Sequence, residues 1–593
     1  MRNYILKNLY LTLPLLLIFS SMIKAQIPIQ IEQIRPNFIT ISNDLHGENR
    51  IGYRFHEHEP IAYGRVPLSD REANLHPDKI DVLIDSFKTS DNVFTYTHEI
   101  EKSAHWVKQD WKYYLVPKKD GLEILLEVNT YEEGLPEYYG VQQCFRMSGI
   151  TNEAWRQEIA KTPAFSEYDL WKNEGDKQKT SLTFVLRNNQ WEPLPAGDKC
   201  VGARTPLGLA VDHLRTDGNL MDEVGPYKAL MQMPIDNSLI TRTDVDEKWV
   251  SAIYWEQTSH VTNHHPADCL HSIINIGNIP PRSRKILRGK IYWFKGSKDQ
   301  LYHHFTQDFR NEDDQSKLNV AACQFPVSGN IDKNAEWIEK QMRIAKVRGG
   351  ELVHFPECAL SGYGGADIES FADFDWNLLK EQTSNICKLA KDLKLWVLLG
   401  SSHQLSDGNK PHNSLYLINP DGRIQDRYDK RFCTNGDLEH YSPGDHFVRF
   451  EIGKIQCGLL ICYDVRFPEL YRAYSQMGVD VIFQSFYNAR HSADCIHPKI
   501  MPLSAQTRAA TNFFYMSLTN SSEPYSWPCH FITPNGLVEN KLEANKPGIL
   551  LSEIDIRNNY YDASLKFRKE SIEGKFNSGD IVDDPKSADR TSY

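Results

Sequence analysis

Residues 453–467 read GKIQCGLLICYDVRF, and this stretch decides the fold expected for the second half of the chain. An apolar run of strand length ends at Cys462, and Pro468 then opens a helical run from Glu469 to Met477. In α/β proteins reactive side chains gather where strands end, because the sheet holds them rigidly while the loops leave them accessible. A thiol near a helix start, with a cation nearby, has a lowered pKa. Cys462 is therefore a candidate nucleophile.

Two other segments end in groups that complement a thiol. The strand-like run Val353–Pro356 leads into Glu357, and the strand-like run Arg423–Tyr428 is followed closely by Lys430. A carboxylate within reach can take the thiol proton and later deliver it to a leaving amine. A lysine supplies positive charge where a tetrahedral intermediate develops its oxyanion. Each of these residues alone is more common as a surface acid, a surface lysine or a buried small thiol.

From residue 318 onward, strand-like and helical patterns alternate. An apolar face recurs at the three- and four-residue spacing of a helix between Ile331 and Ala345. A second helical pattern surrounds Leu378–Leu393. Strands are predicted at Leu318–Gln324, Leu352–Phe355, Leu395–Gly400, Ser414–Ile418, Phe447–Ile452 and Ile455–Ile461.

Residues 318–557 resemble the carbon–nitrogen hydrolases, also called the nitrilase superfamily. Glu357, Lys430 and Cys462 stand in the family's order, each inside a matching motif. The other matching features are Pro468-Glu469-Leu470, the helix-like Arg508–Asn512 with the strand Phe513–Ser517 behind it, and the turn Pro534-Asn535-Gly536. The resemblance implies an α-β-β-α sandwich, generally assembled into homo-oligomers across a helical face. It also implies a Glu–Lys–Cys catalytic triad that needs neither a metal nor an organic cofactor.

The family's pattern assigns further residues. Members often carry a second glutamate shortly before a Pro-Gly pair, where it orients the substrate amide, and Glu439 takes that place. It lies closer to the lysine than in many members, so a simple loop acid is the alternative. The backbone N–H of Tyr463 is expected to share the oxyanion with Lys430. Asn488 lies where the family builds its pocket wall and is a candidate for substrate binding, with a solvated loop as the alternative.

The residues after the nucleophile indicate an amide rather than a nitrile as the substrate. Nitrile-hydrolysing members usually have Trp-Glu there, whereas Tyr463-Asp464 resembles the amidase branches. The carbamoylase branch often has two arginines just beyond, and only Arg466 matches. We therefore expect hydrolysis of a linear, non-peptide amide through a cysteine thioester. An N-carbamoyl hydrolase and an acyl-transferring member are the alternatives, although the family's lipid-acting acyltransferases have several membrane spans.

Residues 26–310 are rich in strand-like patterns and form a predicted accessory domain. Apolar residues alternate through Leu122–Asn129, as in a half-buried strand, and Gly, Pro, Asn and Asp clusters separate similar runs. This pattern is typical of an all-β, β-sandwich-like domain. The charged stretch at residues 311–317 is the predicted linker, and residues 558–593 form a predicted charged surface tail.

Two groups of residues in the N-terminal half bear on binding. A cluster of potential metal ligands matches no established zinc spacing, and we predict a polar loop instead; it consists of His260, His264, His265, Asp268, Cys269 and His271. Eight of the twelve tryptophans also lie there. Exposed aromatic rings can stack on sugars, although core packing is their usual role. A carbohydrate-binding protein with a secondary hydrolase domain is therefore an alternative, and the amide substrate is either a small molecule or glycan-linked.

Length, charge and the N-terminus limit the remaining possibilities. A chain of 593 residues is expected to contain at least two folded units. The net charge of −11, without a basic run, gives no reason to expect a nucleic acid partner. Residues 1–25 combine Arg2 and Lys7 with an apolar stretch and small residues before Gln26, which predicts a signal peptide and export, to the periplasm or beyond. No later segment is apolar enough to span a bilayer. Eleven cysteines are an odd number, and no disulfide pairing is assigned.

Overall fold

The computed structural model describes residues 29–35, 38–43, 50–54, 82–87, 93–100, 107–146, 183–194, 200–211, 234–243, 247–264, 269–309, 315–406, 408–488 and 492–592. The predicted signal peptide at residues 1–25 and residues 311–314 of the predicted linker lie outside these ranges. Within them, no helix is long and apolar enough to cross a bilayer. The nine cysteines whose side chains are described are all free thiols.

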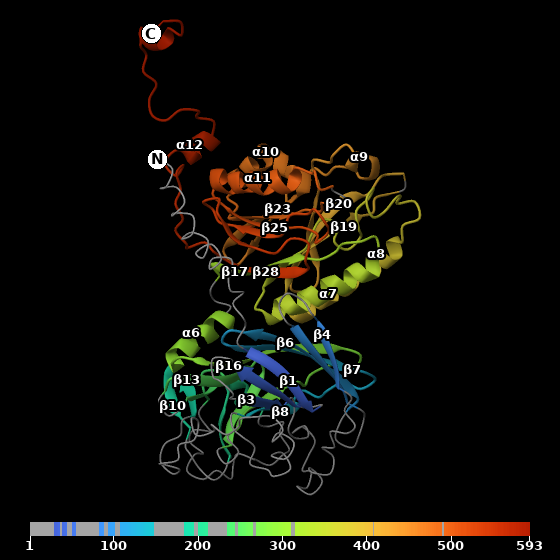
Figure 1. Ribbon diagram of the computed structural model, residues 1–593, viewed down its shortest axis with the longest axis vertical. Coiled ribbons are helices and arrows are strands. Elements are labelled where there is room, and N and C mark those ends of the chain that lie inside the picture. The colour runs from blue at the N-terminus through green and yellow to red at the C-terminus, as the bar shows by residue number, and fades with distance from the viewer. Residues whose placement is uncertain are drawn as a thin grey trace, which may run out of the picture.

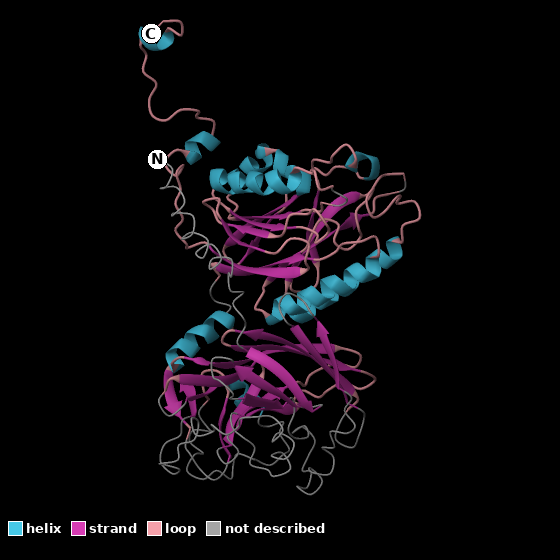
Figure 2. Ribbon diagram, in the orientation of Figure 1, coloured by secondary structure: helices cyan, strands magenta, loops and turns pink. Residues whose placement is uncertain are grey.

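The described part of the N-terminal half is built on two antiparallel sheets (Figure 2). The seven-stranded sheet has the order β1 (Ile29–Arg35), β2 (Phe38–Asn43), β3 (Arg50–Arg54), β8 (Gly140–Arg146), β15 (Cys269–Asn275), β14 (Thr258–His264) and β11 (Cys200–Arg204). The nine-stranded sheet has the order β10 (Gln190–Pro193), β9 (Thr183–Arg187), β12 (Ile240–Thr243), β13 (Trp249–Trp255), β16 (Arg284–Lys295), β7 (Gly121–Thr130), β6 (Gln109–Lys118), β5 (Val93–Ile100) and β4 (Val82–Phe87). Two described helices accompany them, α4 (Pro206–Val211) and α6 (Lys298–Asp308).

The two sheets of this half share one hydrophobic core. Val141 and Val261 contribute to it from the seven-stranded sheet, and Leu126 and Ile291 contribute from the nine-stranded sheet. The strand-rich character expected for this region is confirmed. The β-sandwich-like domain as a whole remains a prediction, because connections such as residues 147–182 lie outside the described ranges.

Strand β7 differs from the half-buried strand that its alternation predicts. Its side chains are buried on both faces, and Glu123 and Glu127 are each only 5% exposed. Leu125 joins an apolar cluster with helix residues of the C-terminal half, and Glu127 accepts a hydrogen bond from Arg343. The apparent polar face of this strand is therefore an internal surface, covered by a helix that lies more than 200 residues later in the sequence.

The C-terminal half contains two six-stranded sheets stacked face to face, with helices outside each (Figure 1). The first has the order β21 (Ile424–Asp429), β20 (His412–Ile418), β19 (Trp396–His403), β18 (Leu352–His354), β17 (Lys317–Gln324) and β28 (Gly548–Asp555). The second has the order β22 (Arg449–Ile452), β23 (Ile455–Ile461), β24 (Val481–Ser485), β25 (Tyr515–Thr519), β26 (His530–Ile532) and β27 (Val538–Lys541). One core lies between the sheets, with Leu398 from the first and Leu459 from the second.

The helices complete an α-β-β-α order of layers. Helices α7 (Ile331–Val347) and α8 (Trp376–Leu393) pack on the outer face of the first sheet, where the apolar stripe of α7 is buried. Helices α10 (Pro468–Gln476) and α11 (His497–Asn512) lie outside the second. The strands of both sheets run parallel at their centres, from β17 through β19 and from β23 through β25. Their carboxyl ends therefore bring the predicted functional residues together.

Helix α7 also connects the two halves of the chain (Figure 1). Its residues Ile338 and Met342 share a hydrophobic cluster with Tyr114 and Leu125 of the N-terminal half. The Nε of Arg343 lies 2.7 Å from the Glu127 carboxylate, with side chains only 10% and 7% exposed. The predicted division at residues 311–317 is untested, but the two halves pack against each other through an apolar and charged interface.

The predicted tail runs away from the rest of the chain (Figure 1). It contains two short helices, α12 (Arg568–Ile572) and α13 (Pro585–Ala588), neither of which has a buried residue. The first of these helices still contacts the helical layer of the second sheet: the Nε2 of Gln476 on α10 donates to the carbonyl of Ile572 at 3.3 Å.

Candidate active site

The thiol of Cys462 lies at the end of strand β23, on a sharply turned backbone. Cys462 has a φ of 42°, which non-glycine residues rarely adopt, and it begins a 3₁₀ turn, η7 (Cys462–Arg466). Asp464 holds this turn in place. Its fully buried carboxylate accepts the N–H of Ile461 and of Phe432, both at 3.0 Å, and the hydroxyl of Tyr428 at 2.8 Å. The strand end and these three bonds fix where the sulfur points.

Glu357 faces this thiol from the other sheet. It is fully buried in the loop after β18. One carboxylate oxygen accepts from the Nζ of Lys430 at 2.9 Å and from the Nδ2 of Asn413 at 2.8 Å, and the other accepts from the backbone N–H of Tyr487 at 2.9 Å. Burial raises the pKa of Glu357, and Lys430 offsets this only in part. The carboxyl is also within hydrogen-bonding reach of the Cys462 thiol.

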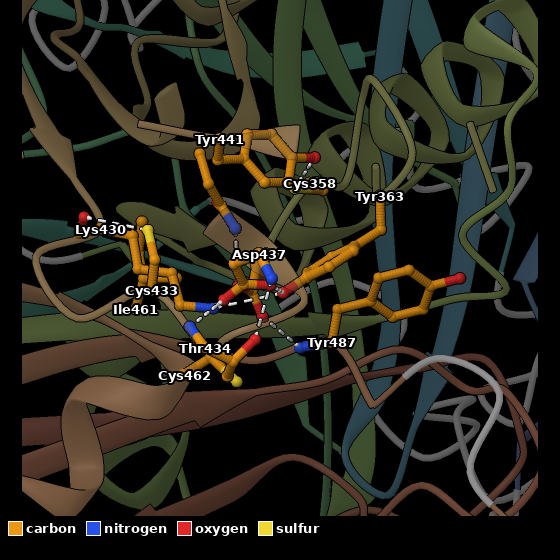
Figure 3. A network of polar contacts seen from close by, with 12 residues as sticks. Cys358, Tyr363, Lys430, Cys433, Thr434, Asp437, Tyr441, Ile461, Cys462 and Tyr487 are labelled. Carbon is orange, nitrogen blue, oxygen red and sulfur yellow. Dashed lines mark hydrogen bonds and ion pairs between the residues drawn. The ribbon is translucent and has the colours of Figure 1, made fainter. Parts of the chain in front are cut away.

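Lys430 lies between two carboxylates at the end of β21. Its Nζ is 2.9 Å from Glu357 and 2.8 Å from the Oδ2 of Asp437, and it also donates to the hydroxyl of Tyr363 at 3.3 Å. Figure 3 shows Lys430, Asp437 and Tyr363 pointing toward one another. Burial opposes the charge, but Glu357 and the neighbouring groups outweigh it and hold the pKa of Lys430 well above its usual value. The lysine is therefore a fixed cation beside the thiol.

The pKa of the Cys462 thiol is raised, whereas the sequence predicts a lowered value. Burial and the carboxylate of Glu357 raise the pKa of Cys462 well above its usual value, and Lys430 opposes them only in part. The helix start and the cation are both present, but burial and the carboxylates of Glu357 and Asp437 outweigh them. Cys462 is consequently protonated in the resting site, so it would have to lose this proton to act as a nucleophile. Glu357 is the carboxylate beside it that would accept the proton.

Glu439 does not take part in this cluster. It lies in the short helix α9 (Asp437–His440), and its side chain is exposed. Asp437, two residues earlier, is 3% exposed and is the carboxylate that contacts Lys430. Two residues apart on a helix point to nearly opposite sides, so only one of these acids can face the site. The backbone N–H of Thr434 donates to Asp437 at 2.8 Å and fixes it toward the lysine.

Tyr463 and Asn488, the other two residues predicted to contact the substrate, lie in different places. Tyr463 is the first residue after the thiol, at a 3₁₀ turn start where backbone N–H groups lack an internal partner. Asn488 is 2% exposed and exchanges hydrogen bonds with Asn520, donating its N–H at 3.2 Å and accepting from the Asn520 Nδ2 at 3.1 Å. Asn488 thus belongs to a buried wall rather than to the polar cluster or a solvated loop. The neighbouring residues 489–491 lie outside the described ranges.

The sequence contains no pattern from which several groups of this cluster could be predicted. Asn413 and Asp437 come from a strand start and a short helix, and Tyr363 comes from the loop after Glu357. Tyr487 contributes its backbone N–H, which any residue type provides. Their shared feature is a tertiary contact to Glu357 or Lys430, which no spacing along the chain reveals.

Comparison with known proteins identifies this half of the chain. The family model described as Carbon-nitrogen hydrolase matches residues 319–558. These residues form a carbon–nitrogen hydrolase domain. The omega-amidase NIT2 of Xenopus tropicalis is 30% identical over 176 residues, which cover 28% of this chain and 62% of that protein. The omega-amidase NIT2 of Mus musculus is 27% identical over 258 residues, covering 41% of this chain and 90% of that protein.

Solved structures are similar at lower sequence identity. An amidase from Nesterenkonia sp. AN1 in complex with butyramide is 20% identical with a TM-score of 0.37, covering 40% of this chain and 91% of that one. A glutamine-dependent NAD+ synthetase from Acinetobacter baumannii is 21% identical with a TM-score of 0.37, covering 41% of this chain and 46% of that one. The chain spans 62% of the length of several curated relatives, including the human omega-amidase NIT2.

The N-terminal histidine cluster lies apart from the hydrolase domain and is not a simple polar loop. His260 and His271 are buried on the paired strands β14 and β15, where the Nδ1 of His271 lies 2.9 Å from the Oγ1 of Thr262. His264 and Cys269 are paired in the same hairpin, and His265 and Asp268 lie outside the described ranges. The described residues contain no group of three potential ligands placed to hold a metal ion.

Proposed function

We propose that this protein hydrolyses a linear, non-peptide amide through a thioester on Cys462. The observation that carries the proposal is the convergence of Glu357, Lys430 and the Cys462 thiol at the carboxyl ends of facing parallel strands. The omega-amidase relatives support amide hydrolysis as the reaction class. The acyl group of the substrate is a separate question, because the pocket walls rather than this cluster select it.

The geometry supports a two-stage reaction. Glu357 takes the thiol proton as sulfur attacks the amide carbonyl, and the carbonyl electron pair becomes an oxyanion. Lys430 and the backbone N–H of Tyr463 stabilise that charge. Glu357 then returns the proton to the nitrogen, the C–N bond breaks and ammonia or an amine leaves. In the second stage Glu357 accepts a proton from water, the hydroxide attacks the thioester and the acid leaves as the thiol is restored.

An amide fits this site better than a nitrile. The buried carboxylate of Asp437 lies beside Lys430 and takes the place expected for a second acid at Glu439. That carboxylate already accepts from Lys430, Tyr363 and the N–H of Thr434, so the preference for an amide rests on Tyr463-Asp464, which resembles the amidase branches, and on the omega-amidase relatives. The carbamoylase alternative receives no support from Arg466, whose side chain is exposed.

The alternative role in carbohydrate binding receives little support from the tryptophans. Trp111, Trp255 and Trp293 are fully buried core residues. Trp191 and Trp249 are half-buried, and each packs against another ring, Tyr302 and Trp293 respectively. Within the described ranges, these rings therefore pack inside the protein rather than forming an exposed platform for sugars.

Export and self-association are further parts of the proposal. Cleavage before Gln26 would be seen as that N-terminus on the mature protein, whereas retention of Met1 would contradict export through this signal.

Copies are proposed to associate through the outer helices of the hydrolase domain, where α10 and α11 border a surface hollow of about 510 Å³. Light scattering on the purified chain tests this, and a monomer at all concentrations would contradict it.

The decisive test of activity compares the wild type with Cys462→Ala on a panel of primary amides, with ammonia release as the readout. Cys433→Ala is the matched control, because this nearby half-buried thiol contacts the carbonyl of Lys430 at 3.9 Å but lies outside the proposed reaction. Loss of turnover in Cys462→Ala alone is expected. Comparable turnover in Cys462→Ala and the wild type would show that the nucleophile is misassigned.

A further inference from the structure

The ammonium group of Lys430 is fully occupied in the resting site. An ammonium has three N–H donors, and Lys430 has three acceptors: Glu357 at 2.9 Å, Asp437 at 2.8 Å and the Tyr363 hydroxyl at 3.3 Å. The lysine is 1% exposed, so water does not compete for these donors. An oxyanion can gain a hydrogen bond from this lysine only if one of the three partners gives it up.

The three partners are not equally strong. Glu357 and Asp437 are carboxylates, and hydrogen bonds between two charged groups are shorter and stronger than those to a neutral acceptor. The contact with Tyr363 is the longest of the three and the only one to an uncharged group. The N–H that points at Tyr363 is therefore the one that turns to a new anion at the lowest cost.

Tyr363 keeps a second contact that does not depend on this N–H. Its hydroxyl donates to the Oδ1 of Asp437 at 2.5 Å. Its ring packs against Tyr441 and Tyr487 with centroid distances of 5.9 and 5.6 Å, and its backbone N–H donates to Asp367 at 2.9 Å. The tyrosine therefore stays in place when the lysine N–H turns away from it.

We propose that Tyr363 is a positioning residue that holds the third Lys430 N–H ready for the oxyanion. This inference rests on the proposed amide hydrolysis. The Tyr363 oxygen accepts that N–H in the resting site and releases it when the carbonyl electron pair becomes the oxyanion. The proton of the tyrosine stays on its own oxygen, donated to Asp437, so Tyr363 neither gains nor loses a proton in the reaction.

Asp437 reports on this arrangement through its titration. It contacts Lys430, the Tyr363 hydroxyl and the backbone N–H of Thr434. Its charge also acts on Glu357 and on the thiols of Cys358, Cys433 and Cys462. Burial raises the pKa of Asp437, but Lys430 and the Tyr363 hydroxyl together lower it by a larger amount, so it lies below its usual value. Loss of the hydroxyl makes Asp437 easier to protonate, and a protonated Asp437 no longer holds the lysine. Glu357, whose pKa is raised, sets the upper part of the acid limb, which is the fall in reactivity as the pH drops, and Asp437 sets its lower part. The lower part should then move to higher pH.

The test uses the full chain with Tyr363→Phe and two readouts across about pH 2.5 to 9, a range that extends below the usual aspartate pKa of about 3.9. The first readout is the rate at which iodoacetamide alkylates Cys462, resolved from the other thiols by peptide mass spectrometry. The second is kcat/KM for a primary amide. Tyr441→Phe is the matched control, because its hydroxyl contacts the Gly364 N–H at 2.7 Å and the Cys358 thiol at 3.6 Å instead.

We expect Tyr363→Phe to move the lower, Asp437-dependent part of the acid limb to higher pH in both readouts. The optimal kcat/KM should fall less than about tenfold, against about 100- to 1,000-fold for loss of a direct oxyanion donor. Tyr441→Phe should leave the limb in place. The shift should also vanish in an Asp437→Asn background. An unmoved limb, or a loss of 100-fold or more at every pH, would overturn the role. A wild type that hydrolyses no amide, but shows the alkylation shift, would refute the proposed function and leave the positioning role standing.

Discussion

Replacing Arg343 by methionine tests whether the N-terminal half is an integral part of the hydrolase. Arg343 lies on α7 and pairs with Glu127 of β7 at 2.7 Å, with both side chains about nine-tenths buried. Methionine keeps most of the apolar stem that packs at this interface but removes the guanidinium. Glu127 is then left in the interface with Arg284 at 3.9 Å as its remaining cation.

The expected magnitude follows from this burial. Removing one partner of a buried ion pair costs about 3–5 kcal/mol, because the other charge stays desolvated and unpaired. The remaining contact with Arg284 places the loss at the lower end, about 3 kcal/mol. Arg282→Met is the matched control, since its pair with Glu132 has the same 2.7 Å distance but is 75% and 78% exposed. An exposed pair contributes about 0–1 kcal/mol.

The pair also predicts the pH dependence of stability. Burial raises the pKa of Glu127, but Arg343 and Arg284 lower it by a larger amount, so the pKa in the folded protein lies below the usual value. A lowered folded pKa contributes stability above the unfolded value of about 4.3, and this contribution is lost as the pH falls. The difference in stability between Arg343→Met and the wild type should therefore be largest near neutral pH and smaller in acid.

Urea unfolding followed by tryptophan fluorescence and circular dichroism measures these differences. The reasoning predicts that Arg343→Met lowers the free energy of unfolding far more than Arg282→Met. Replacing Glu127 by glutamine in the Arg343→Met background should recover part of the loss, because the unpaired charge is then gone. Equal effects of Arg343→Met and Arg282→Met would refute the claim that this ion pair joins the two halves.

Three further predictions concern the site. Glu357→Gln and Lys430→Ala should each lower kcat by at least about 1,000-fold, and the double variant should be little worse than either single one, because the residues act as a unit; an additive loss in ammonia release would contradict this. Asp437→Asn should lower kcat/KM by about 10- to 100-fold, since it leaves Lys430 with a weaker neutral partner, whereas the exposed Glu439→Gln should stay within about twofold; the reverse order would restore Glu439 to the site. A primary amide should be hydrolysed faster than the nitrile with the same acyl group, because Tyr463-Asp464 follows the thiol as in the amidase branches, and equal or faster release of ammonia from the nitrile would refute the assigned bond type.

The sequence predicted the residues whose signals are local. Cys462 and Glu357 are each reached at the end of an apolar strand pattern, and the predicted strand Ile455–Ile461 is present with the same bounds as β23. Strand ends, turns and helix starts depend on neighbouring residues, so the chain itself carries their signal. The family's order of motifs then brought Lys430 into the same site.

The sequence could not predict features that depend on distant contacts. Asp437 and Glu439 are both acids before the same Pro-Gly pair, and only the orientation of α9 decides which one faces Lys430. The alternation in β7 looks half-exposed until α7 covers it. The thiol of Cys462 has the helix start expected to lower its pKa, but burial among carboxylates raises that pKa instead.

The central claim is that Cys462 carries the acyl group, and mass spectrometry of peptides from the trapped protein tests it most directly. The wild type is mixed with a turned-over primary amide, quenched in acid within milliseconds and digested. The account predicts an added mass equal to the substrate minus ammonia, located on the peptide that contains Cys462 and absent from Cys462→Ala. An acyl adduct on another residue, or undiminished acid release by Cys462→Ala, would contradict the account.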